Sequence, residues 1–300
     1  MRRAGLRLFF ITTPFILAVL LFSYLPLYGW IYAFYDYHAG LSLSQCTFVG
    51  LKHFISLVNN TVTTGEILRI IRNTFAMSFL GILVSPLPII FAILLVEMRS
   101  RFSQRVIQTL TTLPNFISWI LVYSVAWAMF SVGDGFVNRL LIMMNVISTE
   151  INFLASNKNV WLTMIAYSVW KGLGWSAIIY LAAIVSIDQE LYEAATVDGA
   201  NRYQKMWHIT VPGILPTYFV LLLLTIANFI NNGMEQYYVF QNAMNKSWIE
   251  VLDLYVYNQG MIGSNISFAT AVGILKSFVS IVLLFGANKL SVFVRGEKII

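Results

Sequence analysis

The chain alternates between six long hydrophobic runs and shorter polar segments. Each run has about the length that a helix needs to cross a bilayer, roughly 20 residues. Pro86 and Pro88 are expected to bend the second run, and Pro114 to interrupt the third. The pattern predicts an all-α protein that forms a single transmembrane domain over residues 1–300. The six expected spans are residues 8–35, 73–96, 106–130, 160–185, 214–230 and 268–290.

The first run follows a basic start, residues 1–7, and so has the charge pattern of a signal peptide. It is longer than the apolar core of a signal peptide, and no small-x-small cleavage site follows it. We therefore interpret residues 8–35 as the first span.

Composition supports an integral membrane protein and excludes other classes. Of the 300 residues, 58% are hydrophobic and 11% are charged, whereas soluble domains carry about 25% charged residues. The net charge of +6 needs no nucleic acid to explain it, because cytoplasmic loops of membrane proteins carry excess Lys and Arg. The single cysteine, Cys46, excludes an internal disulfide and cannot form a metal site alone.

No catalytic constellation occurs in the sequence. The three histidines are scattered, and there is no His-Glu-x-x-His, paired-cysteine or nucleophile-elbow pattern. The nucleotide-binding pattern Gly-x-x-x-x-Gly-Lys-Ser/Thr is also missing. We therefore expect no catalytic residue, metal or cofactor in this chain.

The distribution of Lys and Arg sets the expected orientation. With the N-terminus inside, eleven of these residues fall in inner segments, from Arg2 to Lys298, and six fall in outer segments, from Lys52 to Lys246. Inner loops are the ones enriched in positive charge. Both termini and the polar segment 186–212 are therefore expected in the cytoplasm.

The polar segment 186–212 predicts a helix-turn-helix between the fourth and fifth spans. Ser186, with Gln189 three residues later, has the pattern of a helix N-cap. Asp198-Gly199 supplies a turn, because glycine tolerates positive φ, and a second short helix is expected over residues 200–208. Small residues in this segment would let the backbone of another protein approach closely. They are Ala194, Ala195, Gly199 and Ala200.

The spacing Glu193-Ala194-Ala195, three residues, Gly199-Ala200, eight residues, Ile209-x-Val211-Pro212 resembles the EAA loop of ABC-importer permeases. Val211 stands where that pattern usually has Leu. Further stretches resemble the carbohydrate branch of type I permeases, close to maltose-type subunits, and more narrowly the subgroup that imports oligosaccharides from polysaccharide breakdown. They are residues 24–29, 48–54, 72–74, 113–118, 250–257 and 269–277.

The resemblance implies a type I ABC-importer permease fold in the inner or cytoplasmic membrane of a bacterial cell. It also implies a second homologous permease subunit, two ATPase subunits that bind ATP and Mg, an external solute-binding protein and an oligosaccharide substrate. In the family, the EAA loop seats in a cleft of the ATPase, so residues 186–212 (the coupling loop) would link ATP hydrolysis to rocking of the permeases. The coupling residues implied are Glu193, Ala194, Ala195, Asp198, Gly199, Ala200 and Arg202.

These coupling residues differ in their expected roles. We expect Glu193 to contact a basic residue of the ATPase, and Gly199 to form a turn that no side chain crowds. Asp198 fits a local cap better than a direct contact. Arg202 fits a contact and an inside-positive anchor equally.

Sugars are bound by aromatic stacking and planar polar groups, and such residues occur on the third to fifth spans. Tyr123 and Trp127 are four residues apart and share a helical face. Lys171 lies within a span, where it would contact an anionic sugar, or else form an interhelical ion pair or reach the interface. Interfacial aromatic belts explain most membrane Trp and Tyr, so that interpretation stays open. The pathway candidates are Tyr123, Trp127, Lys171, Trp175, Asn228 and Asn232. Candidates for contact with the binding protein or partner permease are Glu235, Gln236 and Tyr237.

Two other functions remain as alternatives. A secondary transporter or channel would need acidic residues within its spans for ion coupling, and the second to sixth spans hold no clear acidic residue in their cores. A membrane-embedded enzyme would need converging His, Asp or Glu at a membrane face, and the sequence shows no such group.

Overall fold

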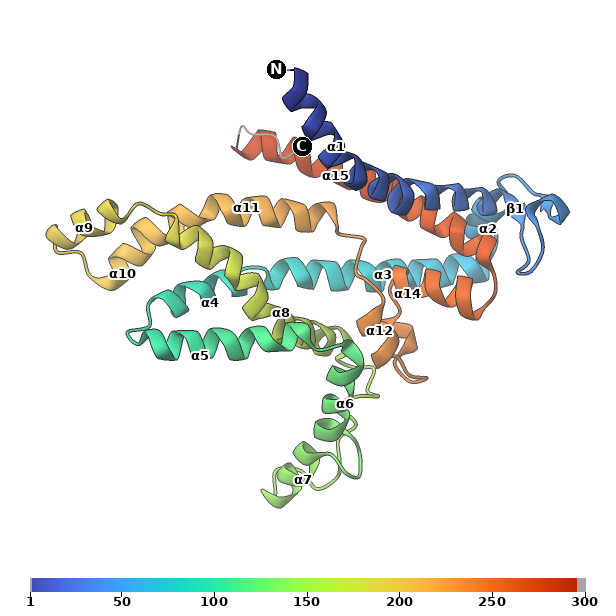
Figure 1. Ribbon diagram of the computed structural model, residues 1–300. Helices are drawn as coiled ribbons and strands as arrows, with labels where there is room; N and C mark the ends of the chain where they lie inside the picture. The colour runs from blue at the N-terminus through green and yellow to red at the C-terminus, as the bar shows by residue number, and fades with distance from the viewer. Residues whose placement is uncertain (1, 296–300) are drawn as a thin grey trace. The chain divides into compact units, whose positions relative to one another are not determined.

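The structure, a computed structural model, describes residues 2–295, and most of them are helical (Figure 1). The all-α prediction is therefore confirmed. Within that range the only sheet pairs β1 (Tyr35–Asp36) with β2 (Thr47–Phe48) in antiparallel fashion. The orientation prediction counts Lys298, which lies outside the described residues.

The α-helices vary from four to thirty residues in length. They are α1 (Arg2–Val19), α2 (Lys52–Asn59), α3 (Thr61–Val84), α4 (Leu87–Val96), α5 (Arg101–Thr112), α6 (Trp119–Phe130), α7 (Phe136–Met143), α8 (Val160–Val185), α9 (Gln189–Val197), α10 (Arg202–Lys205), α11 (Val211–Ala227), α12 (Glu235–Phe240), α13 (Lys246–Ile249), α14 (Leu252–Tyr257) and α15 (Ile266–Arg295). Stretches of 3₁₀-helix are Leu25–Phe34, Leu43–Gln45 and Leu113–Phe116, and π-helical turns are Leu20–Tyr24, Met206–Thr210 and Asn258–Ile262.

Five helices of the described chain are long and apolar enough to cross a membrane, and a bent helix pair makes a sixth candidate. The fourth expected span, residues 160–185, coincides with α8. The five are Phe9–Phe34, Thr61–Val96, Val160–Val185, Arg202–Ala227 and Ile266–Val292, and the bent pair is Arg101–Phe116 with Trp119–Phe130.

The second candidate helix begins at Thr61 rather than at residue 73. Asn60 starts it, because its Oδ1 accepts hydrogen bonds from the N–H groups two and three residues later. Thr61–Val96 has 36 residues and measures about 54 Å at 1.5 Å per residue, whereas the hydrocarbon core of a bilayer is about 30 Å thick. The first turns of α3, which carry Arg69 and Arg72, therefore extend beyond the hydrocarbon.

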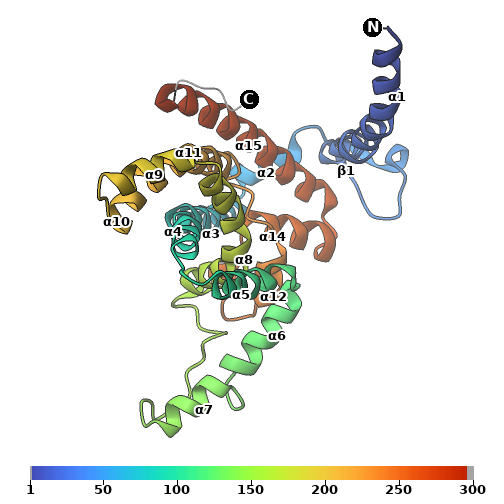
Figure 2. The same ribbon diagram turned by 60° about the vertical axis from the view of Figure 1, so that its left-hand side comes forward.

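The third expected span, residues 106–130, consists of two helices rather than one. α5 continues into the 3₁₀ turn that contains Pro114, and α6 then leaves at an angle of 107° (Figure 2). Ser118 starts the new helix, because its Oγ accepts a hydrogen bond from the N–H of Leu121 at 3.4 Å. Each piece is shorter than a full span, since the 12 residues of α6 measure about 18 Å.

The chain divides into two compact units, residues 2–68 with 255–278 and residues 69–254 with 279–295. In the first unit, the backbone N–H of Tyr37 donates to Ser267 Oγ at 3.0 Å, which ties the end of the first span to the start of α15. Tyr255 packs edge to face against Phe268 in the same unit.

In the second unit, α8 is the central helix and packs against α4, α5 and α11 (Figures 1 and 2). Tyr180 and Ile184 on its buried face form a core with Ile214 of α11. At Gly174, a Cβ would lie 2.4 Å from the backbone of Thr111. Glycine at this position therefore lets α5 and α8 touch along their backbones.

Candidate functional site

The coupling loop, residues 186–212, begins with a cap that the sequence pattern misplaces. Asp188, not Ser186, caps α9, because Asp188 Oδ1 accepts a hydrogen bond from the N–H of Glu190 at 3.0 Å. Ser186 instead ends α8, where its Oγ donates to Ala183 O at 2.7 Å. A carboxylate is well placed at the start of α9, since it meets the positive end of the helix dipole.

α9 ends in a Schellman turn at Gly199. The φ of Gly199 is +78°, and the N–H of Ala200 donates to Ala195 O at 2.8 Å. Asn201 then caps α10 in a reciprocal pair with Gln204. The expected glycine turn is thus present, and the backbone groups of the loop form hydrogen bonds with residues that are close in the sequence.

The second helix of the loop is part of a much longer one. α10 continues through the π-helical turn Met206–Thr210 into α11, so the helix runs from Arg202 to Ala227 rather than ending near residue 208. Pro212 lies two residues after the end of the π turn and, like Pro216 further along α11, has no N–H to donate. The regular hydrogen-bond ladder is therefore interrupted at these positions, without breaking the helix.

The surface of the coupling loop carries apolar side chains with nothing to cover them in this chain. Val197, Tyr203 and Trp207 are 89%, 75% and 63% exposed. Among the described residues, the carboxylates of Glu193 and Asp198 make no hydrogen bond or ion pair, so the side-chain cap expected of Asp198 is not formed. An exposed surface of this kind is typical of a protein-binding site.

Arg202 has a weak partner, since its Nε lies 3.7 Å from Glu97 Oε2 on the exposed surface. Lys205 Nζ donates to Thr196 Oγ1 at 2.6 Å. An exposed ion pair contributes little to stability and exchanges easily. The predicted coupling residues comprise five that are exposed, Glu193, Ala194, Asp198, Gly199 and Arg202, and two that are half-buried, Ala195 and Ala200.

Two further contacts fix the start of the loop to its end. The Tyr192 hydroxyl and Thr210 Oγ1 lie 2.9 Å apart. A Cβ at Gly213 would lie 2.5 Å from Ile187 Cδ1, so glycine there lets the chain after α8 pack directly on α11. The loop is therefore exposed on its outer face and firmly attached at its base.

A cavity of about 670 Å³ lies in the second unit among α3, α8, α11 and the segment that follows α11. Three of the six pathway candidates line it, namely Trp175, Asn228 and Asn232. Asn232 Nδ2 donates to Ser78 Oγ on α3 at 2.9 Å. The polar residues of the lining are Ser78, Ser85, Ser168, Ser176, Tyr180, Thr225, Asn228, Asn231, Asn232 and Tyr237.

Lys171 does not line this cavity. Its Nζ donates to Asn115 O at 2.7 Å and lies 5.5 Å from the centre of the Trp119 ring. Carbonyl and ring together stabilise the ammonium at the bend between α5 and α6. Within the described part of the chain it makes no ion pair, so the interhelical ion pair considered for Lys171 is not formed, while its contact with a sugar stays a prediction.

Tyr123 and Trp127 also lie away from the cavity, on α6. Their ring centres are 6.2 Å apart, so the two residues do share a helical face. Tyr123 packs edge to face against Phe240, with ring centres 5.1 Å apart. The sequence identifies the shared face correctly but not what that face contacts.

Residues 228–254, here named the outer segment, run from the end of α11 into α14 and contribute to the lining of the cavity. Gln236 and Tyr237 are only 7% and 4% exposed, whereas Glu235 is exposed; contact of these residues with the binding protein or partner permease stays a prediction. Gln236 Nε2 donates to Met164 O at 2.7 Å, and its Oε1 accepts from Ser168 Oγ at 2.7 Å. Gln236 therefore fastens the outer segment to α8.

Tyr237 presents a neutral phenol to the cavity. Burial raises the pKa of Tyr237 above its usual value, and the nearby Asp253 carboxylate raises it further. Asp253 Oδ2 itself accepts a hydrogen bond from the N–H of Gly233 at 2.8 Å. The phenol consequently remains protonated at every physiological pH.

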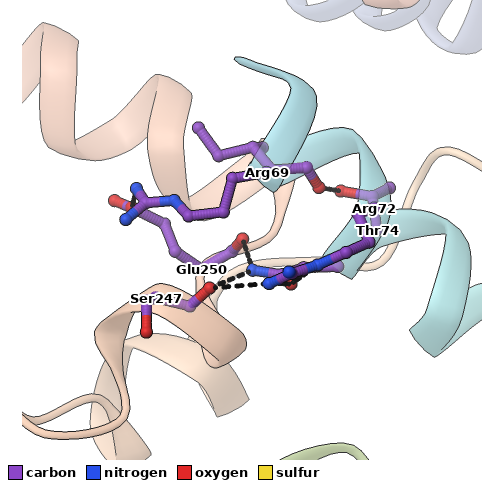
Figure 3. Close-up of polar contacts among 7 residues, drawn as sticks. Arg69, Arg72, Thr74, Ser247 and Glu250 are labelled. Carbon is purple, nitrogen blue, oxygen red and sulfur yellow. Dashed lines mark hydrogen bonds and ion pairs between the residues drawn. The ribbon is translucent and has the colours of Figure 1, made fainter. Parts of the chain in front are cut away.

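Four residues of α3 clamp the far end of the outer segment (Figure 3). Arg69 Nη2 donates to Glu250 Oε2 at 2.9 Å, and Glu250 is only 2% exposed. The fully buried Asn73 donates through Nδ2 to Ser247 O at 3.1 Å and to Glu250 O at 3.0 Å. Thr74 Oγ1 accepts from the backbone N–H two residues after Glu250 at 2.9 Å. With Arg72, these residues form the outer clamp.

Arg72 extends the outer clamp to α8. Its guanidinium carbon lies 4.1 Å from the ring centre of Trp248 and 5.7 Å from that of Trp161. It also donates to Ser247 O at 3.2 Å, while Trp161 Nε1 donates to Trp248 O at 2.8 Å. Three elements, α3, α8 and the outer segment, are joined in this way.

Sequence reasoning missed the outer clamp, although a signal was present. Residues 72–74 and 250–257 both belong to the stretches that resemble the carbohydrate branch of permeases, yet nothing in a single sequence pairs them. Gly213 was missed as well, because a close approach leaves no local pattern. Among the residues that the structure describes, no three His, Cys, Asp or Glu side chains come together as metal ligands would.

Comparison with known proteins gives one family match and several long relatives. A family described as "Binding-protein-dependent transport system inner membrane component" matches residues 84–292. Protein LplB of Bacillus subtilis (strain 168) is 40% identical over 282 residues, covering 94% of this chain and 87% of LplB. The "Polygalacturonan/rhamnogalacturonan transport system permease protein YteP" of the same strain is 38% identical, covering 95% and 87%.

The fold is also similar to a solved structure. A chain in the "Crystal structure of bacterial alginate ABC transporter in complex with alginate pentasaccharide-bound periplasmic protein" is 30% identical, with a TM-score of 0.86 over 99% of this chain and 97% of that one. The likeness therefore extends over the whole described fold, including the coupling loop, the cavity and the outer segment.

Proposed function

This chain belongs to the family of binding-protein-dependent transport system inner membrane components, and from that premise we propose that it is the transmembrane subunit of an ATP-driven oligosaccharide importer. It forms half of the translocation pathway together with a second, homologous permease. Two ATPase subunits on the cytoplasmic side bind ATP and Mg, and this chain has no catalytic site, metal or cofactor of its own. Both termini lie in the cytoplasm, and a solute-binding protein delivers the sugar from outside.

The observation that carries this proposal is the coupling loop. Its backbone is satisfied locally, its base is fixed to α8 and α11, and its outer face exposes Val197, Tyr203 and the unpaired carboxylate of Glu193. A loop built in this way is ready to receive a protein partner without first having to fold. Glu193 offers a charge to a basic residue of the ATPase, and Gly199 keeps the turn free of a side chain.

The loop is also connected to the pathway by continuous helix. α10 and α11 form one helix from Arg202 to Ala227, and Thr225, near its far end, lines the cavity. A displacement of the loop by the ATPase therefore moves a wall of the cavity directly. The continuous helix between the loop and the wall supports alternating access by rocking, and the π turn and Pro216 are the places where this helix can bend.

The substrate follows from the lining of the cavity and from the relatives. Trp175, 50% exposed, offers an aromatic face, and the hydroxyl and amide groups around it match the hydroxyls of a sugar. The relatives carry names that include polygalacturonan, rhamnogalacturonan and arabinooligosaccharides, and the similar structure binds an alginate pentasaccharide through its periplasmic protein. We assign oligosaccharides from polysaccharide breakdown as the substrate class.

Co-purification tests the proposal. The tagged chain is extracted with mild detergent from its native host, as wild type, Gly199→Trp and Gly199→Asn. Gly199 has positive φ and no atoms within 4 Å of a built Cβ, so a Trp side chain would project into the docking face, whereas Asn tolerates this conformation and stays small.

We expect a second permease and an ATPase to co-purify with wild type and with Gly199→Asn, and the ATPase alone to be lost from Gly199→Trp. Equal thermal unfolding of the three proteins shows that the loss is one of docking. If wild type purifies alone and moves solute in liposomes without ATP, a secondary transporter replaces the importer.

A further inference from the structure

The cavity of the second unit is lined without a single ionisable acid or base. Of the 19 described residues that line it, none is Asp, Glu, Lys, Arg or His. Its polar groups are hydroxyls and amides from Ser, Thr, Asn and two Tyr, Tyr180 and Tyr237, and the Tyr237 phenol is neutral because burial raises its pKa.

Charged side chains near the cavity are engaged elsewhere. Lys171 of α8 is held at the bend between α5 and α6 by Asn115 O and Trp119. Arg69 and Arg72 of α3 are used in the outer clamp. None of these three cations lines the cavity, although each stands on a helix that does.

A charge-free lining has a physical consequence for transport. A fixed cation in a cavity walled by protein would attract a sugar carboxylate far more strongly than water does and so would hold an acidic sugar in place. Hydroxyl and amide contacts are individually weak, and a pathway needs contacts that are favourable enough to admit the cargo and weak enough to release it. Neutral groups of the cavity can also form hydrogen bonds with the hydroxyls of the sugar ring, which carboxylated and uncharged sugars have in common.

We propose that this chain's half of the pathway is indifferent to charge: it admits uronic-acid and neutral oligosaccharides alike and reads only ring shape and hydroxyls. The inference rests on the proposed function and deepens it. It assigns the recognition of sugar carboxylates to the binding protein or the partner permease and removes Lys171 from that role.

The test uses the complete importer, purified with its partners and reconstituted in liposomes with its binding protein outside. Uptake is measured for two acidic probes, a galacturonate trimer and an alginate trimer. It is measured in parallel for the same trimers with their carboxyl groups reduced to alcohols. The readout is the ratio of acidic to neutral uptake in each variant divided by the same ratio in wild type. This double ratio cancels any preference of the binding protein.

Two variants decide the outcome. Lys171→Gln keeps a donor near Asn115 O, and we expect its double ratio to stay at one. Thr225→Asp places a negative charge on an exposed position of the lining, and we expect it to lower the ratio about tenfold by repulsion of the carboxylates. Thr225→Asn controls for the loss of the hydroxyl, and Asn157→Asp adds the same charge on an exposed turn away from the cavity.

The failures are distinguishable. A ratio that falls in Lys171→Gln overturns the inference, because this chain would then recognise charge after all. A ratio unchanged in Thr225→Asp also overturns it, because the sugar would not pass this lining. If the wild-type importer takes up none of the four probes in the presence of ATP, the oligosaccharide proposal itself fails.

Discussion

The coupling loop and the outer segment are both polar connections of the second unit, but they are held in opposite ways. The coupling loop closes its hydrogen bonds within a few residues, at Asp188, Gly199 and Asn201, and leaves its surface exposed. The outer segment closes its bonds against α3 and α8, more than 60 residues away in the chain, and buries Gln236, Tyr237 and Glu250.

The two regions are held differently because they have to meet different requirements. The coupling loop needs a defined shape that can be offered to another protein, so local caps suffice and the surface can stay free. The outer segment must hold its part of the cavity lining in place, so it requires buried contacts with other elements of this chain. We therefore expect substitutions in the outer clamp to lower stability first, and substitutions in the loop to lower coupling first.

The largest effect is expected at Asn73. Asn73→Ala removes the two hydrogen bonds to Ser247 O and Glu250 O in a fully buried site. Ser247 O keeps Arg72 as a donor, but Glu250 O loses the Asn73 amide and Arg72 loses Asn73 Oδ1 as an acceptor, and a buried group left unpaired costs about 1–3 kcal/mol. We expect a loss of roughly 3 kcal/mol in the free energy of unfolding in detergent. Asn59→Ala, at an exposed position of α2, is the matched control. An equal loss in both variants would contradict a specific role for the clamp.

Arg72 comes next. Arg72→Ala removes the guanidinium that stacks on Trp248 and bonds to Ser247 O. Since a cation over an aromatic ring contributes about 0.5–2 kcal/mol, we expect a decrease of that size in stability, accompanied by a change in tryptophan fluorescence. Arg72→Lys should recover part of the stability through its charge. The stacking would be unimportant if Arg72→Lys matched the wild type fully.

A smaller effect is expected at Asp188, the cap of α9. Asp188→Ala should reduce the local stability of the loop by about 1 kcal/mol, while Asp188→Ser should retain most of it. Hydrogen exchange of the amides of α9 measures this directly, because the change concerns one short helix. The free energy of global unfolding should hardly change. If it decreased as much as in Asn73→Ala, the coupling loop and the outer segment would not differ as described.

The smallest effect on stability is expected at Arg202. Its exposed pair with Glu97 spans 3.7 Å, and such pairs contribute about 0–1 kcal/mol. Arg202→Ala should therefore leave thermal unfolding unchanged. Stimulation of the ATPase by the Arg202→Ala variant distinguishes the two roles left open by the sequence. Lost stimulation shows that Arg202 contacts the ATPase, and unchanged stimulation shows that Arg202 is an inside-positive anchor.

The same comparison explains which features the sequence could predict. Hydrophobic runs and short-range signals identify α8, the glycine turn at Gly199 and the small residues of the loop, because these depend on neighbours in the chain. The N-cap of α9 shows where short-range signals fail. Ser186 and Asp188 are both good N-cap residues, and only the length of α8 determines that Asp188 caps α9. The end of α10 was missed because the π turn keeps the helix going where Pro212 suggested a boundary.

Pathway residues were predicted only in part, for a physical reason. Trp175, Asn228 and Asn232 do line the cavity, but Tyr123 and Trp127 lie on the helix that turns away by 107°, and residue spacing along a span does not reveal such a bend. Lys171 was singled out because it is charged, and its true partners, Asn115 O and the Trp119 ring, lie more than 50 positions earlier. The outer clamp depends entirely on contacts of this long-range kind.

The π turn at Met206–Thr210 gives the coupling loop a helical phase that one residue controls. Deletion of a single residue there would return the turn to α-helical spacing and rotate everything before it by about 100° around the axis. α11 and the cavity wall would keep their place, while Tyr203 and the rest of α10 would face a different direction. The number of residues in this one turn therefore determines which side of the helix the ATPase meets.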